Sequence, residues 1–147
     1  ATLHANNSYH ALSRILSFYT PESRPTLLSD LASGLRAVVS QRLLRSNAGS
    51  RVPAVEVLLN TKLVAELIEK GDLPGVKEAM EKSMAQGSQT FEQDIARLIT
   101  EGTVSREEGL SHADSPTNLV WRLENDDAPA SRAPVVKKAD SDDAVYT

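Results

Sequence analysis

Ala37-Val38-Val39-Ser40-Gln41-Arg42-Leu43-Leu44 and Val52-Pro53-Ala54-Val55-Glu56-Val57-Leu58-Leu59 are two apolar, β-branched stretches separated by a short polar segment. The first stretch alternates partly between apolar and polar residues, and both have the length of a strand. The pattern predicts an antiparallel hairpin closed by the polar loop at residues 45–50. Pro53 then lies near the start of its strand, where a missing backbone donor is tolerated.

The segment before the hairpin has the order strand, polar turn, helix. Ala1–Leu3 is a short β-branched and apolar tip, and the polar turn His4–Asn7 follows it. A strand that ends in such a turn presents polar groups to a ligand in α/β proteins. We therefore expect part of a larger α/β protein, with any phosphate-binding loop lying upstream. Helical spacing predicts two helices with apolar faces at Leu12, Ile15, Leu16 and Tyr19, with Asn6 or Asn7 as cap, and at Leu28, Leu31 and Leu35.

The segment from residue 61 to residue 123 has helical spacing and repeated start and stop signals. Thr90 with Gln93, and Ser105 with Glu108, have the spacing of capping boxes. Glycines after the apolar faces predict helix ends, and the Met80/Met84 pair is expected in a core. We predict a small helical bundle, a turn at Asp114–Asn118 and a short closing segment at Leu119–Leu123 around Trp121. Residues 124–147 are rich in Asp, Ala, Pro and Ser, and are predicted to be a disordered tail.

Composition excludes several classes of protein. The chain has 147 residues and a net charge of -4, which argues against nucleic acid as a partner. It has no cysteine, so disulfides and zinc-thiolate sites are excluded. No apolar run approaches the roughly 20 residues that span a bilayer. The composition suits a soluble, intracellular domain.

His4 is the sharpest candidate for a functional residue, because an imidazole at the end of a strand can contact a ligand or a phosphate. The alternative, favoured on spacing alone, is that it caps a turn or bonds a backbone carbonyl. His10 and His112 are expected on solvated helix surfaces. A metal site made of His4, His10 and a carboxylate has no supporting ligand spacing.

Charged residues in and around the hairpin give a second set of candidates. Glu56 is either a buried carboxylate in a nucleotide site or, as we prefer, the partner of Arg42 in a cross-strand ion pair. Arg14, Arg36, Arg42 and Arg51 are candidates to contact phosphate or a neighbouring subunit, although single arginines are more often surface residues. No Gly-rich phosphate loop and no Ser-His-Asp order is present, so this segment alone is not expected to bind a nucleoside triphosphate with Mg²⁺.

An ordered set of segments resembles a known family, the secretion-type (GspE-like) hexameric ATPases, and within it the type IV pilus retraction (twitching motility) ATPases of the PilT/PilU type. The resemblance runs from Ala1 to about Leu123, and the tail lies outside it. The segments that carry it are Thr2-Leu3-His4, Arg14-Ile15, Ser40-Gln41-Arg42-Leu43-Leu44, Arg51-Val52-Pro53-Ala54-Val55-Glu56, Asn60-Thr61, Gly87-Ser88-Gln89-Thr90-Phe91 and Ala113-Asp114-Ser115.

The resemblance implies an α/β fold: residues 1–60 as the C-terminal portion of a RecA-like P-loop ATPase core, and residues 61–123 as the helical region after it. His4 matches the last histidine of the family's His box, which lies near the nucleotide, so the resemblance raises its functional interpretation above the structural one. The intact protein is then expected to bind ATP and Mg²⁺ with motifs upstream of this segment. It would form a homo-hexamer, or a mixed assembly with a paralogous retraction ATPase, in which Arg14, Arg36 or Arg42 act in trans. The implied location is cytoplasmic, at an inner-membrane pilus platform protein.

Departures from the family pattern favour the accessory PilU-like paralogue. Ala65-Glu66 and Glu69 stand where the principal motor has an Arg-Asn pair and an Arg, and Asn6-Asn7 replaces small hydroxyl residues. Two alternatives remain: a non-enzymatic helical interaction module, and a type II secretion or pilus-assembly ATPase of the same superfamily. An exposed sheet edge also predicts that the first 60 or so residues are marginally folded and the helical part firmer.

Overall fold

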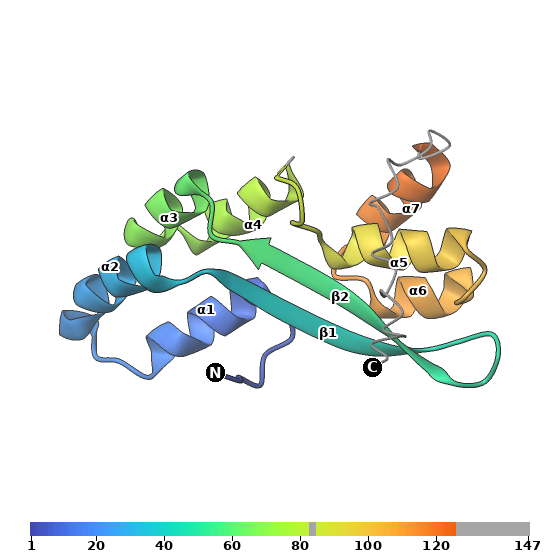
Figure 1. The fold of residues 1–147 in the computed structure, drawn as a ribbon, viewed down its shortest axis with the longest axis horizontal. Coiled ribbons are helices and arrows are strands. Elements are labelled where there is room, and N and C mark those ends of the chain that lie inside the picture. Colours follow the sequence, from blue (N-terminus) through green and yellow to red (C-terminus); the bar gives the residue numbers. More distant parts are fainter. Residues whose placement is uncertain (83–84, 126–147) are drawn as a thin grey trace, which may run out of the picture.

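The structure is a computed structural model that describes residues 1–82 and 85–125. Seven α-helices, one 3₁₀ helix and a two-stranded sheet make up these residues, which confirms the α/β class (Figure 1). The elements are α1 Ser8–Ser17, η1 Pro21–Ser23, α2 Arg24–Gly34, β1 Ala37–Arg45, β2 Arg51–Leu59, α3 Lys62–Glu69, α4 Leu73–Glu81, α5 Phe91–Thr100, α6 Arg106–His112 and α7 Pro116–Asn125.

The predicted hairpin is confirmed, and it runs through the middle of the molecule (Figure 1). β1 and β2 pair antiparallel from Ala37↔Leu59 to Arg45↔Arg51. Alternate residues therefore face opposite sides, and the side that carries Leu44, Ala54 and Leu58 is turned toward the helices. A short bridge between Val57 and Gln89 extends the pairing beyond β2.

Two hydrophobic cores lie at opposite ends of the hairpin (Figure 1). The near core contains α1, α3 and α4, with partly buried residues of α2 packed against it; its buried members are Leu12, Leu58, Val64, Ile68, Leu73, Val76 and Met80. The far core contains α5, α7 and the other end of the hairpin; its buried members are Leu44, Ala54, Phe91, Ile95, Ala96, Leu98, Val104 and Leu119. The predicted helical region is thus divided between the cores, and the near core draws on both sides of residue 60.

Local capping signals define most helix starts. Asn7 caps α1 by accepting from the His10 backbone N–H, and Thr61 caps α3 by accepting from Val64. Thr90 and Gln93 form the predicted capping box of α5, with both hydrogen bonds present. Gly71 ends α3 with φ of 71°, a left-handed conformation that residues with a Cβ avoid.

Three local predictions are wrong. Ala1–Leu3 is not a strand, because among the described residues no strand lies beside it to supply hydrogen bonds. Ser105 does cap α6, but the Glu108 side chain accepts from the Arg45 backbone N–H in β1 instead of closing a capping box. The predicted turn at residues 114–118 is shorter, because Pro116 begins α7 in the position where a helix tolerates proline.

Helix α7 includes Leu119–Leu123 and continues through Asn125, so residues 124 and 125, which were assigned to the tail, are helical. The rest of the predicted tail, residues 126–147, and Met84 of the Met80/Met84 pair lie outside the described residues. Among the residues that the structure describes, no helix has the length and apolar character needed to cross a membrane.

Candidate functional site

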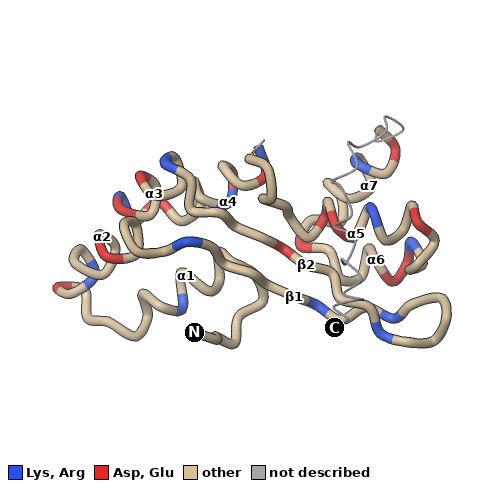
Figure 2. The backbone as a smooth tube through the Cα atoms, viewed as in Figure 1, with Lys and Arg blue, Asp and Glu red and all other residues tan. Residues whose placement is uncertain are grey.

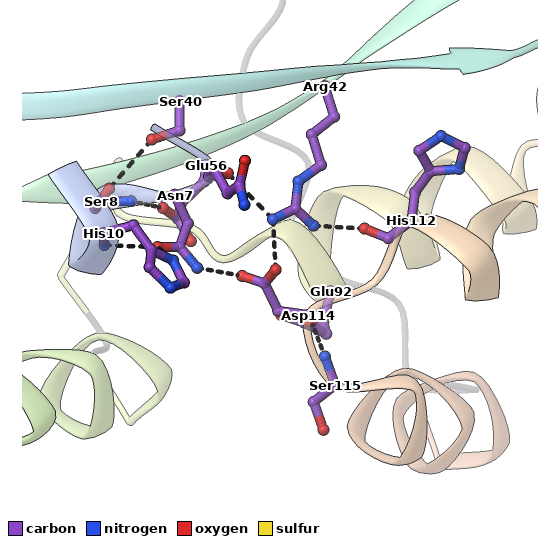
Figure 3. A network of polar contacts seen from close by, with 11 residues as sticks. Asn7, Ser8, His10, Ser40, Arg42, Glu56, Glu92, His112, Asp114 and Ser115 are labelled. Atoms are coloured by element: carbon purple, nitrogen blue, oxygen red, sulfur yellow. Dashed lines mark hydrogen bonds and ion pairs between the residues drawn. The ribbon is translucent and has the colours of Figure 1, made fainter. Parts of the chain in front are cut away.

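Arg42, on the inner face of β1, is the centre of a polar network between the two cores (Figure 3). Its guanidinium forms an ion pair with Asp114 and donates to the backbone carbonyls of His112 and Asn6, the latter at 3.1 Å. The guanidinium also lies over the Phe91 ring, 4.0 Å from the ring centre. One side chain therefore contacts the start of the chain, the beginning of α5 and the connection between α6 and α7.

Asn7 links this network to the start of α1. Its side-chain amide donates to Asp114 Oδ2 at 2.8 Å, while its Oδ1 accepts from the His10 backbone N–H at 2.9 Å and lies 2.8 Å from the His10 ring Nδ1. Asn7 is buried, and both ends of its amide have partners. The predicted helix cap is thus also a tether between α1 and the connection that follows α6.

Glu56, in the middle of β2, is a buried carboxylate that accepts a hydrogen bond from the Ser8 backbone N–H at 2.7 Å. Burial raises the pKa of the Glu56 carboxyl, and the charge of Asp114 adds to this rise. Hydrogen bonds from Ser8 and the charge of Arg42 oppose it. The carboxylate holds the first turn of α1 against β2.

The preferred cross-strand ion pair between Arg42 and Glu56 is wrong. The register places Ser40 opposite Glu56 and Ala54 opposite Arg42, so the two charged residues are diagonal neighbours on one face. Each takes another partner, Asp114 for Arg42 and Ser8 for Glu56. The charge of Arg42 still lowers the pKa of Glu56, but the two side chains do not form an ion pair.

A small, partly open pocket of about 20 Å³ lies beside the network, with Glu56, Glu92, Asp114, Asn7 and Thr90 in its wall. This volume suits about one water molecule. Glu92 is buried and accepts from the Ser115 backbone N–H at 2.8 Å. Among the described residues, no group of three or more His, Cys, Asp or Glu side chains has the arrangement of a metal site. Basic and acidic residues are interspersed over the helices, so charge density does not distinguish this network (Figure 2). The burial of Asn7, Ser8, Glu56 and Glu92 within it does.

His4 lies outside the network, on an exposed segment two residues before Asn6. It lines an open hollow together with His10 and Arg14 of α1. The structure thus brings together two of the three histidines and one of the candidate arginines on one face. Arg36 and Arg51 are exposed elsewhere, at the two ends of the hairpin.

Sequence reasoning missed Asp114 as a charged partner, because Asp-Ser-Pro-Thr-Asn is also the pattern of a simple turn. His112 contributes its backbone carbonyl to the network, and its ring contacts Ser111 and Glu108 instead. No local signal connects Arg42 to a carboxylate 72 residues away. The segment Ala113-Asp114-Ser115, already part of the family resemblance, was the one indication that this connection has a specific role.

Comparisons with known proteins relate this chain to the pilus ATPases. The chain is 43% identical over 120 residues to the type IV pilus ATPase PilU of Pseudomonas aeruginosa, a match that covers 81% of this chain and 31% of PilU. It is 27% identical over 118 residues to the type IV pilus retraction ATPase PilT of the same organism, covering 80% of this chain and 34% of PilT. No family model matches the chain.

Solved structures share the fold. The pilus retraction motor PilT with bound ADP superposes with a TM-score of 0.72 at 27% identity, covering 82% of this chain and 33% of the motor. The Legionella pneumophila ATPase DotB gives a TM-score of 0.61 at 23% identity, covering 74% of this chain and 29% of DotB, which supports the fold alone. The chain spans about a third of the length of the relatives that it matches. The chain therefore belongs with the PilT/PilU-type pilus ATPases and corresponds to a C-terminal part of such a protein.

Proposed function

We propose that this chain is the C-terminal part of a motor ATPase that uses ATP hydrolysis to retract type IV pili and so drives twitching motility. The observation that carries the proposal is the 43% identity to PilU over 120 residues. The fold shared with the ADP-bound retraction motor supports it. The higher identity to PilU than to PilT favours an accessory, PilU-like member.

Within the intact protein, this segment contributes the His4 surface to the nucleotide site. His4, His10 and Arg14 line one open hollow, so two imidazoles and a guanidinium are available to an anionic group such as a phosphate. ATP and Mg²⁺ are bound mainly by residues upstream of Ala1. Arg14 and Arg36 are exposed, as a contact with a neighbouring subunit requires, whereas the Arg42 side chain is already held by partners in this chain.

The intact protein assembles as a homo-hexamer, or in a mixed ring with a paralogous retraction ATPase. It works in the cytoplasm at the inner-membrane base of the pilus, against a platform protein. The near core and the far core pass the movement from the nucleotide side to the rest of the ring, because the hairpin and the network around Arg42 connect them.

The test is ATP hydrolysis by the parent chain extended upstream through its phosphate loop, together with the oligomeric mass. We expect a ring-sized assembly that hydrolyses ATP. His4→Ala and Arg14→Ala should lower kcat about 10-fold or more if these groups act on the nucleotide. Arg51→Ala, at the exposed far end of the hairpin, is the matched control and should retain activity.

An extended chain that neither binds nor hydrolyses ATP would exclude the motor. The alternative, in which residues 61–113 dock on a partner as an independent helical module, has less support. α3 and α4 pack on α1 and α2 in the near core, and the far core includes Leu44 and Ala54 of the hairpin, so neither core is built from this region alone.

A further inference from the structure

We propose that Arg42 is a positioning residue that fixes the His4–Asn7 segment to the connection between α6 and α7. Arg42 and Asp114 form the centre of this tether, and Asn7 strengthens it. The role of His4 in this inference rests on the proposed function, but the tether itself does not. The consequence is that His4 does not move independently of the far core.

The geometry of Arg42 is that of a three-way junction (Figure 3). Its guanidinium contacts Asn6, His112 and Asp114, which lie 36, 70 and 72 residues away in the sequence. A planar fork with several donors can hold segments that approach from different directions, whereas a lysine ammonium cannot do so with the same geometry. Nη1 donates to the His112 carbonyl, and Nη2 contacts both Asn6 and Asp114, so one guanidinium ties the start of the chain and the α6–α7 connection to β1.

Asp114 binds both Arg42 and Asn7. Its Oδ1 pairs with Arg42, and its Oδ2 accepts from the Asn7 side-chain amide. The Arg42 and Asp114 side chains are 18% and 21% exposed, so solvent screens this pair only in part. A charge-assisted hydrogen bond in such a place is stronger than an exposed ion pair.

The His4–Asn7 segment has few other anchors. Residues 1–5 have no regular secondary structure, and His4 is exposed. The Asn6 carbonyl and the Asn7 side chain are bound by the network, and the Asn7 carbonyl accepts from Ala11 in the first turn of α1. The position of His4 is therefore set two residues away, by the partners of Asn6 and Asn7.

Arg42 also offsets negative charge at this junction. Asp114, Glu56 and Glu92 line one pocket, and Arg42 pairs with the first and lies near the second. Without the guanidinium, the repulsion between Asp114 and the buried Glu56 would not be offset. Loss of Arg42 should therefore separate the start of α1 from the α6–α7 connection, and not only remove one contact.

The test compares amide hydrogen exchange in Arg42→Gln, Asp114→Asn and Arg97→Gln variants of this chain. Arg97 is the matched control, because it pairs with Asp94 at 2.8 Å and with Glu101, both in or directly after α5. Two sets of backbone amides report separately on the Arg42–Asp114 pair and on the Arg97–Asp94 pair. Ser8 and His10 donate to Glu56 and Asn7 beside the tether, and Val55 donates to Asp94.

We expect Arg42→Gln and Asp114→Asn to accelerate exchange at Ser8 and His10 about tenfold or more while Val55 is unchanged. Arg97→Gln should give the reverse pattern. Arg42→Lys should restore part of the protection, because it keeps the charge beside Asp114 but loses the fork. If Arg42→Gln does not fold, Asp114→Asn, which keeps the shape of the side chain, and Arg42→Lys decide the question.

Equal acceleration at Ser8 and Val55 in the Arg42 and Asp114 variants would overturn the tether, because it would show a general loss of stability. No acceleration at Ser8 and His10 would overturn it as well. In the extended chain, the positioning role predicts a lower kcat with little change in the KM for ATP. An extended chain without ATPase activity would refute the proposed function. The tether would still be tested by the hydrogen-exchange result, which does not depend on ATPase activity.

Discussion

The two cores at the ends of the hairpin are built differently. The far core is centred on Phe91, Ile95 and Leu119, all completely buried, and α5 begins with a full capping box. The near core includes α2, which has no buried residue, and several of its contacts come from partly buried leucines. Helices of similar length, such as α2 and α5, therefore need not have similar stability, because the depth of burial of their side chains differs.

The largest expected difference comes from removing the central side chain of the far core. Phe91→Ala should lower the free energy of unfolding by about 3–5 kcal/mol, because it removes a buried ring and leaves a cavity beneath Arg42. Phe18→Ala, at a phenylalanine that is 64% exposed beside the near core, is the control. Urea unfolding measures both. A Phe91 variant as stable as the Phe18 variant would contradict the account of the far core.

Replacing a glycine with alanine should change the stability in opposite directions at the two cores. A Cβ at Gly109 in α6 would lie 2.5 Å from Ile99 Cδ1 and 2.9 Å from Ile95 Cγ2, so Gly109→Ala should destabilise by about 1–3 kcal/mol. A Cβ at Gly34, the last residue of α2, meets nothing within 4 Å. Gly34→Ala should therefore raise the melting temperature slightly, since alanine restricts the unfolded chain. Thermal unfolding of the two variants checks this, and the same sign for both would be inconsistent with the packing described.

Helix capping should contribute to the stability of both cores. Thr90→Ala removes one half of the capping box of α5 and should cost about 1 kcal/mol, and Thr61→Ala should cost a similar amount at α3. Thr→Ser at either position keeps the oxygen and is the matched control. Local exchange rates measure the effect. If Thr90→Ala loosened α3 as strongly as α5, the two cores would not be separate.

The smallest effect is a dependence on pH at the junction between the cores. The pKa of Glu56 is raised by burial in the folded state, so its favourable contribution is complete below the unfolded pKa and is lost as pH rises through the folded pKa. Glu56→Gln keeps an oxygen to accept from Ser8. It should therefore flatten the decline of stability with pH above about 4.5. Melting temperatures from pH 4 to about pH 8 check this, and an unchanged profile would assign the decline to other groups.

Local signals in the sequence predicted the hairpin, a cap at Asn6 or Asn7 and one at Thr90, and most helix positions, because each depends on residues a few positions apart. They did not predict which helices share a core, because an apolar face does not specify its partner. The Arg42–Asp114 pair was also out of reach, since it joins residues 72 positions apart. For Glu56, the preferred ion pair with Arg42 was wrong, because the partner that Glu56 takes depends on where α1 lies.

The most direct test of the account is native-state amide hydrogen exchange of the 147-residue chain at increasing, sub-denaturing urea concentrations. The account predicts two levels of protection, with the amides of α5 opening at a higher free energy than those of α2. Arg42→Gln should lower the protection of the start of α1, which the Arg42 network holds. A single free energy of opening throughout the helices, or greater protection in α2 than in α5, would contradict the division into two unequal cores.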